Sequence, residues 1–260
     1  MKKEDIHIIL TSTTKKAFGD ILLTSYFVSI LNDNGVDAYF FRRGNGRVYA
    51  YMVIDCPKIE AINDKRLKKF PVLRLGYAHG KPGELGIPII SQYCKMFKDR
   101  YNIPIKNNFN YIPVKYYDMP EVPSVDVSLC TKSGGWSQDR DWPYFEQLKE
   151  RLKQSKISYI DLNEEEKFNM ECLNYIKKSK LYVGLETGTS HYASQVANGK
   201  TLILQSGIHD IGFWCSYDYD HLYIPVKCKL CKSLTKCPYD NKCMKDLTVD
   251  MMFNKIIEKL

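Results

Sequence analysis

The segment from Leu181 to His191 concentrates side chains that could do chemistry. An apolar run ends there in an acid, two hydroxyl residues, a glycine and an imidazole: Glu186, Thr187, Thr189, Gly188 and His191. Ligands of open α/β sheets bind outside the carboxyl ends of the strands. We therefore expect this turn to bind a ligand. Backbone N–H groups and the dipole at the start of the following helix would favour an anion such as a diphosphate, and Gly188 would let the backbone approach it closely.

A second loop of this kind follows the strand expected at 125–130. Ser133, Gly134 and Gly135 offer a hydroxyl and an adaptable backbone, and Arg140 adds a cation. A cation at this place can neutralise charge that develops on a leaving group. The alternative is a surface arginine flanked by two aspartates.

Four cysteines near the C-terminus follow the spacing C-x₂-C-x₅-C-x₅-C: Cys228, Cys231, Cys237 and Cys243. Four thiolates so placed can close a tetrahedral site for zinc or iron, and neighbouring lysines would offset their charge. A reducing cytosol favours a metal over disulfides, although labile disulfides and free cysteines are both alternatives. Because no coordination position is left open, such a site would be structural, or a knuckle that holds another subunit.

Alternating strands and helices are expected to position these residues. The hydrophobic pattern predicts strands at 5–10, 36–41, 47–54, 72–75, 125–130, 157–160, 201–205 and 222–226, and one from Leu181. It predicts helices at 21–31, 89–101, 142–152, 165–180 and 191–197, and from 248, with Gly35 ending the first and Asp141 capping the third. Strand, turn, helix and strand is the unit that builds parallel α/β sheets.

The segment 119–124 contains two prolines and is typical of a connection between domains. We therefore predict an N-terminal Rossmann-like domain at 1–120, a C-terminal Rossmann-like domain at 124–226, and a Cys-rich knuckle with a terminal helix at 227–260. The predicted fold class is α/β, with the two Rossmann-like domains facing one another across a cleft that is lined by strand-end loops from both halves.

Composition limits the classes of partner. No run of about 18 apolar residues exists, so no membrane span is expected. The apolar run 8–10 is too short for a secretory signal, and we expect a cytosolic protein. The net charge of +8 would attract phosphate-rich partners or membrane surfaces. It is dispersed along the chain, and no nucleic-acid motif is present, so nucleic acid is not expected as a partner.

Four segments carry a family pattern when they are taken in order along the chain. Residues 18–24 contain a Gly-Asp turn at the start of a helix, and residues 134–143 contain a glycine loop followed by a basic residue and Trp-Pro. Residues 184–191 contain an acid followed by Thr-Gly-x-Ser-His, and the four cysteines follow in the tail. Together these segments resemble the ADP-heptose:lipopolysaccharide heptosyltransferases of glycosyltransferase family 9.

The resemblance implies a GT-B architecture and the inverting transfer of a sugar from a nucleotide-sugar, without a metal cofactor for catalysis. The N-terminal domain would be the acceptor side, and the C-terminal domain would bind the donor. Two features depart from the family pattern. Glu186 replaces the usual aspartate, and the chain is shorter than typical members, with the difference expected in the acceptor half.

The resemblance also implies that Asp20 is the general base. In a one-step displacement the acceptor hydroxyl must lose its proton as it attacks the anomeric carbon, and a positioned carboxylate can accept that proton. A nearby helix N-terminus would favour the charged form. From Gly19 and Asp20 alone, the alternative is a simple helix N-cap.

Nine residues are implied to hold the donor: Ser133, Gly134, Gly135, Arg140, Glu186, Thr187, Gly188, Thr189 and His191. Glu186 would accept hydrogen bonds from sugar or ribose hydroxyls, or would instead cap the next helix. His191 would contact the departing phosphates, or would be a structural histidine.

The prediction is thus a cytoplasmic glycosyltransferase, placed at the inner face of the membrane if the acceptor lies there. It would move a sugar, with heptose from ADP-heptose favoured, onto a hydroxyl of a glycolipid, glycan or protein, as in lipopolysaccharide biosynthesis. The alternative is a catalytically silent protein that binds a nucleotide-sugar or serves in assembly.

Overall fold

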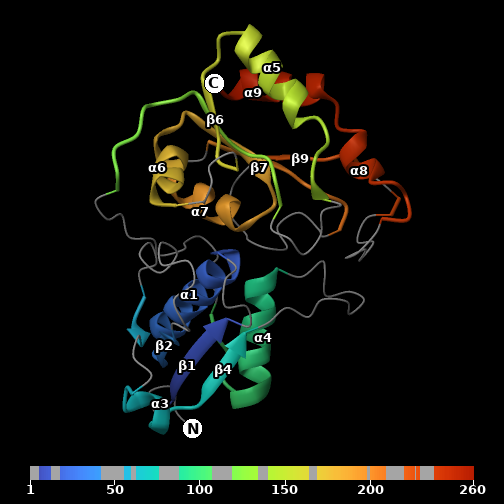
Figure 1. The fold of residues 1–260 in the computed structure, drawn as a ribbon. Coiled ribbons are helices and arrows are strands. Elements are labelled where there is room, and N and C mark those ends of the chain that lie inside the picture. Colours follow the sequence, from blue (N-terminus) through green and yellow to red (C-terminus); the bar gives the residue numbers. More distant parts are fainter. Residues whose placement is uncertain are drawn as a thin grey trace. The chain divides into compact units, whose positions relative to one another are not determined.

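Each half of the chain builds its own parallel sheet in the computed structural model of the protein (Figure 1). The structure describes residues 6–12, 18–41, 56–59, 63–75, 88–106, 119–133, 140–163, 169–197, 200–208, 220–225, 227–228 and 237–260. Described residues up to 106 belong to one compact unit and those from 119 onward to another. The division lies beside the proline-containing segment 119–124, and the tail at 237–260 is part of the second unit.

The first unit has the strand order β3-β2-β1-β4, and all its strand pairs are parallel. Its strands are β1 (His7–Ser12), β2 (Asp37–Phe41), β3 (Lys58–Ile59) and β4 (Val72–Leu75). Its helices are α1 (Phe18–Asp33), α3 (Arg66–Lys69) and α4 (Ile89–Tyr101).

Helix α1 is the centre of this unit. Twelve of its sixteen residues are buried, so it is apolar on nearly all sides rather than amphipathic. Phe27 packs against Tyr93 and Phe97 of α4. The helix ends where Gly35 takes a φ of 79°, as predicted for a glycine that follows a helix.

The second unit has the strand order β6-β5-β7-β8-β9, again with every pair parallel. Its strands are β5 (Val127–Cys130), β6 (Tyr159–Asp161), β7 (Leu181–Leu185), β8 (Thr201–Leu204) and β9 (Asp220–Leu222). Its helices are α5 (Phe145–Gln154), α6 (Met170–Lys178), α7 (Gly188–Val196), α8 (Lys242–Lys245) and α9 (Val249–Lys259).

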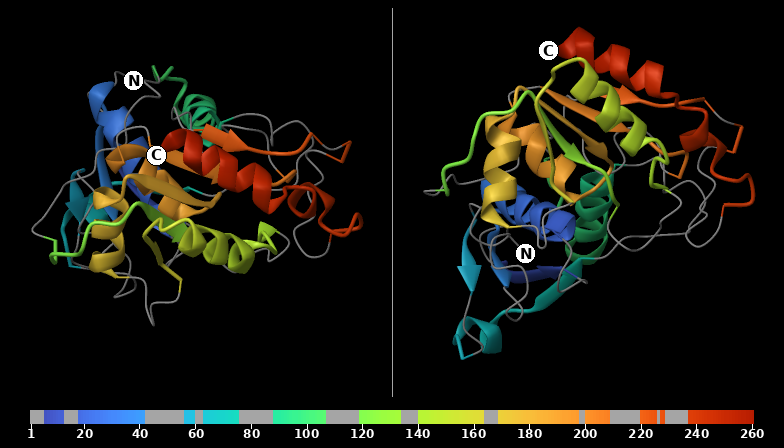
Figure 2. Two further views of the ribbon diagram at one scale, coloured as in Figure 1. Left: turned by 90° about the horizontal axis from the view of Figure 1, so that it is seen from above. Right: turned by 45° about the horizontal axis from the view of Figure 1, so that its top comes forward.

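Helices cover both faces of the second sheet, with α5 and α9 on one side and α6 and α7 on the other (Figures 1 and 2). Alternate strand residues join the core under α5 and α9: Val127, Leu129, Leu181, Val183, Leu185, Leu202 and Leu204. Because a parallel sheet is buried on both faces, its strands are apolar throughout instead of alternating with polar residues. Strands β5, β7 and β8 are buried at every position.

The C-terminal helix is anchored in this core. Thr248 caps α9, since its hydroxyl accepts a hydrogen bond from the Met251 N–H at 3.2 Å, as the sequence predicts. Leu247 and Met252 are fully buried on either side of the cap. The Trp142 Nε1–H donates to the Leu247 carbonyl at 2.8 Å, which ties the tail to the segment before α5.

Several predicted boundaries are wrong. Helix α1 begins at Phe18 and α7 at Gly188, each three residues earlier than predicted. Asp141 does not cap α5, whose N-cap residue is Tyr144. Instead the Asp141 carboxylate accepts a hydrogen bond from the Ser133 N–H at 2.8 Å and so closes the intervening loop. The strand predicted at 47–54 lies outside the described residues.

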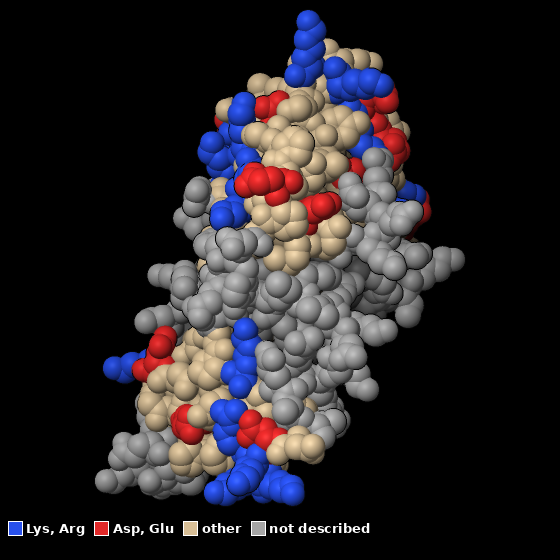
Figure 3. All heavy atoms as spheres, turned by 60° about the vertical axis from the view of Figure 1, so that its left-hand side comes forward, with Lys and Arg blue, Asp and Glu red and all other residues tan. Residues whose placement is uncertain are grey.

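Surface charge is dispersed, in agreement with the sequence. On the face drawn in Figure 3, basic and acidic side chains are interspersed with neutral ones. Lys180 pairs with Asp126 at 2.7 Å, and Lys242 pairs with Asp246 at 2.6 Å. Such exposed pairs stabilise the fold little, but they interrupt the positive surface. Among the described helices, none has the length and apolar character that crossing a bilayer requires.

Candidate functional site

The two loops predicted to bind a ligand follow adjacent strands of the second sheet. β5 and β7 are paired, with Cys130 opposite Gly184. The chain leaves β5 for β6 on one side of the sheet, whereas β7 leads to β8 and β9 on the other. The order of the sheet therefore reverses between β5 and β7, and ligands of open α/β sheets bind at such a switch point.

A buried contact joins the two loops. The Arg140 Nη1 donates to the Glu186 carbonyl oxygen at 2.7 Å, and the two residues are only 3% and 4% exposed. Burial lowers the pKa of Arg140 to about 10, while the charges of Glu186 and Asp141 act in the opposite direction. The guanidinium remains cationic at neutral pH. Because Arg140 is buried, the alternative of a surface arginine is wrong.

The Glu186 carboxyl group has an unusual environment for an acid. Its Oε2 accepts a hydrogen bond from the Gln205 Nε2 at 2.8 Å. Burial raises the pKa of Glu186 to about 8, although Arg140 and the Gln205 hydrogen bond both lower it. Thr187 is the N-cap residue of α7, so the alternative that Glu186 caps this helix is also wrong.

His191 lies in the first turn of α7 and is only 3% exposed. Burial lowers its pKa to about 4. The imidazole is therefore neutral at physiological pH and could serve a phosphate group as an N–H donor but not as a cation.

A network of hydroxyl groups fixes the start of α7. The Thr189 hydroxyl lies 2.7 Å from the hydroxyls of both Tyr182 and Thr187, and it donates to the Cys130 Sγ at 3.3 Å. Gly184 makes this possible, since a Cβ at that position would lie 2.6 Å from the Tyr182 Oη. The threonine hydroxyls thus hold the turn together from within, in addition to any contact with a ligand.

Asp20 lies in the first unit, at the third position of α1. This position is inside the first turn, so Asp20 is not the N-cap residue. The side chain is buried, and burial raises its pKa to about 7. We expected the helix N-terminus to keep the carboxylate charged, but the loss of hydration has the larger effect. The charge of Asp20 contributes to the raised pKa of Tyr93, which places that phenol within its field.

Several solved glycosyltransferases are similar in structure to this chain. The iron-containing dodecameric glycosyltransferase TibC from enterotoxigenic E. coli H10407 superposes with a TM-score of 0.71 over 100% of this chain and 77% of its own, at 14% identity. E. coli ADP-heptose lps heptosyltransferase II superposes with a TM-score of 0.61 at 10% identity, over 97% of this chain and 98% of its own. A glycosyl transferase family 9 protein from Veillonella parvula DSM 2008 gives 0.57 at 11% identity, covering 99% of each chain.

The chain has the heptosyltransferase fold. The predicted resemblance to glycosyltransferase family 9 is therefore confirmed in three dimensions, although no protein-family model and no curated protein sequence matches the chain. At 10–14% identity the similarity establishes the fold, while the chemistry has to be argued from the residues.

Two residues that were not predicted as site residues lie beside Glu186 in this heptosyltransferase fold. Gln205 and Ser206 follow β8, which pairs with β7 so that Leu204 lies opposite Leu185. They are 3% and 4% exposed. The rule that predicts a ligand-binding residue at the carboxyl end of β7 also applies to β8, where two polar residues follow the apolar run 202–204. That signal was present in the sequence.

A second polar network supports the loop after β5. The Thr131 hydroxyl lies 3.0 Å from both carboxylate oxygens of Asp161, to which it donates, and the Lys149 Nζ lies 3.3 Å from Asp161 Oδ2. Asn163 Oδ1 accepts hydrogen bonds from the N–H groups of Thr131 and Lys132 at 2.7 and 3.0 Å. These contacts fix the backbone that leads to Ser133.

Some predicted site residues lie outside the described part of the chain, namely Gly134, Gly135 and Cys231. Cys228, Cys237 and Cys243 are half-buried. Within the described residues, no group of three or more metal-ligating side chains is close enough to hold a metal ion.

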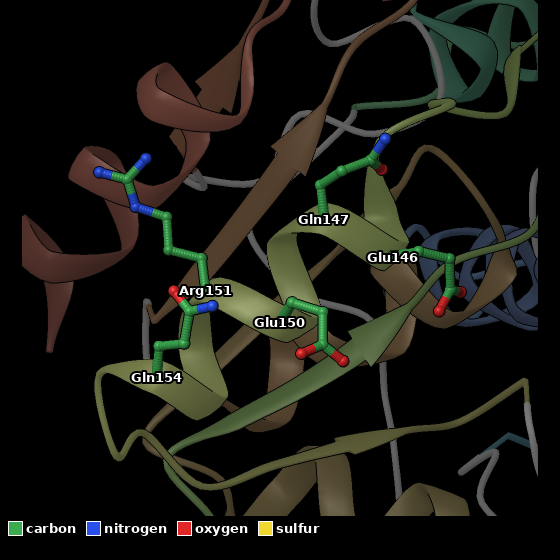
Figure 4. Close-up of a pocket in the computed structure, with 5 residues that line it drawn as sticks. All are labelled: Glu146, Gln147, Glu150, Arg151 and Gln154. Atoms are coloured by element: carbon green, nitrogen blue, oxygen red, sulfur yellow. The ribbon is translucent and has the colours of Figure 1, made fainter.

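A separate surface hollow lies along α5 and is lined by Glu146, Gln147, Glu150, Arg151 and Gln154 (Figure 4). The Arg151 guanidinium pairs with Asp250 and stacks over the Phe253 ring at 4.5 Å. The hollow therefore belongs to the packing of α5 against α9 and shares no residue with the polar cluster around Glu186.

Proposed function

We propose that the protein is an inverting glycosyltransferase that moves a sugar from a nucleotide-sugar onto an acceptor hydroxyl. The observation that carries the proposal is the buried Glu186, held by Arg140 and Gln205 at the switch point of a heptosyltransferase fold. A solved structure of TibC, with a TM-score of 0.68, contains ADP-D-beta-D-heptose, and this favours ADP-heptose as the donor.

The donor would bind across the carboxyl ends of β5 and β7. Arg140 supplies a positive charge that a diphosphate can neutralise, and charge-assisted hydrogen bonds from a guanidinium are strong. The start of α7 adds backbone N–H groups, and neutral His191 adds a further donor. Ser133, Gly134 and Gly135 belong to the facing loop, and the Glu186 carboxyl contacts hydroxyls of the sugar or ribose.

Asp20 would act as the general base on the acceptor. The acceptor oxygen bonds to the anomeric carbon while the bond from that carbon to the diphosphate oxygen breaks, and the hydroxyl proton passes to the Asp20 carboxylate. A pKa of about 7 suits this role, because a general base works best when its pKa is near the working pH. The proposal requires the two units to form the GT-B cleft, with Asp20 and Glu186 facing the same gap.

The acceptor would be a glycolipid, a glycan or a protein in the cytoplasm. The net charge of +8 favours an acceptor that carries phosphate or lies at the inner face of a membrane.

The four tail cysteines are proposed to hold a structural zinc or iron ion, separate from the sugar transfer. Cys228, Cys237 and Cys243 are half-buried, and thiolates are the ligands that zinc and iron prefer. TibC is described as iron-containing. Elemental analysis should find about one such ion per chain and a loss of it in Cys243→Ser. Metal-free wild-type protein would contradict the assignment.

Donor binding tests the main proposal directly. Unfolding would be followed by thermal shift in the presence of ADP-, GDP-, UDP- and CDP-sugars, with ADP-heptose among them. A ligand at 100 times its Kd should stabilise the fold by about 2.7 kcal/mol. We expect ADP-heptose to give the largest shift, and release of ADP on addition of an acceptor extract. A flat response to the whole panel would refute a nucleotide-sugar site.

A further inference from the structure

The residues after β8 lie beside the carboxyl group that the proposed function assigns to the donor. Gln205 Nε2 donates to Glu186 Oε2 at 2.8 Å and to the Ser206 carbonyl at 3.4 Å. The Gln205 backbone N–H donates to the Leu222 carbonyl of β9 at 3.0 Å. The backbone of Gln205 thus belongs to the sheet, while its side chain is directed toward Glu186.

Among the described residues, two buried polar atoms at this place have no hydrogen-bond partner. Gln205 Oε1 and Ser206 Oγ are buried, and neither makes a hydrogen bond with any residue that the structure describes. A buried polar atom without a partner costs about 1–3 kcal/mol, and folded proteins contain few of them. An apolar pair after β8 would avoid this cost. The two atoms therefore point to a bound polar group.

The chemistry of the three groups favours a polyol. An amide oxygen can only accept, whereas a serine hydroxyl and a carboxyl group that holds its proton can each donate and accept. A pair of neighbouring hydroxyls offers both donors and acceptors at short spacing, as these groups require. An anion would meet the amide oxygen and the carboxyl group unfavourably.

We propose that Gln205 and Ser206 form, together with Glu186, a subsite for a vicinal diol of the nucleotide-sugar. Gln205 Oε1 accepts a hydrogen bond from one hydroxyl, and Ser206 Oγ bonds to its neighbour. Gln205 Nε2 meanwhile orients the Glu186 carboxyl group, so Gln205 is both a binding and a positioning residue. The inference rests on the proposed function and adds to it the groups that recognise the donor's hydroxyls.

The test compares three ligands on three variants. Affinities for ADP-heptose, ADP and 2′-deoxy-ADP would be measured by calorimetry for wild type, Ser206→Ala and Gln205→Met. The control is Ser128→Ala, which removes another fully buried hydroxyl, one that is bonded to the Ser179 hydroxyl at 2.8 Å. Ser128 lies inside β5 and outside the site, so its loss should lower the melting temperature without changing any of the three affinities.

We expect Ser206→Ala and Gln205→Met to weaken ADP-heptose binding by about 3- to 10-fold, the usual worth of one hydrogen bond. If the diol is on the sugar, ADP binding is unchanged. If it is on the ribose, ADP binding weakens equally, and 2′-deoxy-ADP binding is unchanged in the variant that has lost the contact to the 2′-hydroxyl but still weakens in the other. In turnover, Gln205→Met should raise the KM for the donor more than it lowers kcat.

Equal affinities of the variants and wild type for ADP-heptose and ADP would overturn the subsite while leaving the proposed function intact. A wild-type protein that binds neither ADP-heptose nor ADP would overturn both the subsite and the proposed function. Should Gln205→Met fail to fold, Ser206→Ala decides the matter, because it removes a single atom that bonds to none of the described residues.

Discussion

Two buried acids, one in each unit, make an instructive comparison. Burial raises the pKa of Asp20 to about 7 and that of Glu186 to about 8. Loss of hydration raises the pKa of Asp20, which lies in the first turn of a helix. Glu186 is opposed by a cation and an amide, and Arg140 also holds its carbonyl. The cation and the amide beside Glu186 suit a binding residue, which is the role that the proposed function gives it.

Asp20→Asn should produce the largest effect. The amide keeps the size of the side chain but cannot accept the acceptor's proton, so turnover should fall by at least about 100-fold while the Kd for ADP-heptose stays unchanged. Steady-state kinetics and calorimetry would measure the two quantities. Asp33→Asn, an exposed acid at the other end of α1, is the matched control. Unchanged turnover in Asp20→Asn would remove the residue from its role, whereas a wild-type protein that binds the donor without turnover would favour the catalytically silent alternative.

Arg140→Met tests the second unit in the same way. It removes a buried cation and the donor to the Glu186 carbonyl, so both charge stabilisation and the shape of the site are lost. We expect ADP affinity to fall by at least about tenfold and kcat by about 100-fold. Arg151→Met on the surface of α5 should change neither. If Arg140→Met bound ADP as tightly as wild type, the diphosphate could not lie against this guanidinium.

The dependence of stability on pH separates the two acids from His191. Asp20 and Glu186 have higher pKa values in the folded than in the unfolded state. Their contribution to the stability of the fold is therefore complete below about pH 4, and it is lost as the pH rises through about 7 for Asp20 and about 8 for Glu186. His191 acts oppositely, because its lowered pKa gives stability above about pH 6.5 that is lost as pH falls toward 4.

Melting temperatures between pH 5 and 8.5 would measure these contributions. The melting temperature of wild type should fall as the pH rises. This fall should be smaller in Glu186→Gln on the alkaline side, and smaller in Asp20→Asn nearer neutral pH. Identical slopes in wild type and both variants would show that the two acids are not buried as described.

Gly184→Ala should give a smaller effect, confined to stability. The new methyl group would lie 2.6 Å from the Tyr182 Oη, so we expect a loss of about 1–3 kcal/mol in denaturant unfolding. Tyr182→Phe in the same chain should recover part of it. Gly35→Ala is the informative comparison, because its added Cβ meets no atom within 4 Å and any loss comes from the φ of 79° alone.

The sequence predicted the elements well where their pattern is periodic. The bounds of β4 and α4 agree with the prediction residue for residue, and the parallel order follows from alternating strands and helices. Helix starts were less accurate, since Gly188 and Thr189 have no hydrophobic period that would assign them to α7. Asp141 resembles a cap in sequence, but its carboxylate bonds instead to a loop N–H eight residues earlier.

The residue types of the candidate site were predictable from the sequence, but their pKa values were not. The sequence selected Glu186, Arg140 and Asp20, but the pKa values depend on burial, which only the packed structure supplies. The pairing of Gln205 with Glu186 joins residues 19 positions apart through the alignment of β7 with β8, and no local motif marks it.

The hydrogen bond from Trp142 to Leu247 has a consequence for control of the protein. Arg140 is two residues from Trp142, so the C-terminal segment and the cation that we propose to bind the diphosphate share one short stretch of backbone. An ion, a partner or proteolysis that orders or loosens the residues around Leu247 would therefore alter the affinity proposed for the nucleotide. The fluorescence of Trp142 would report this change.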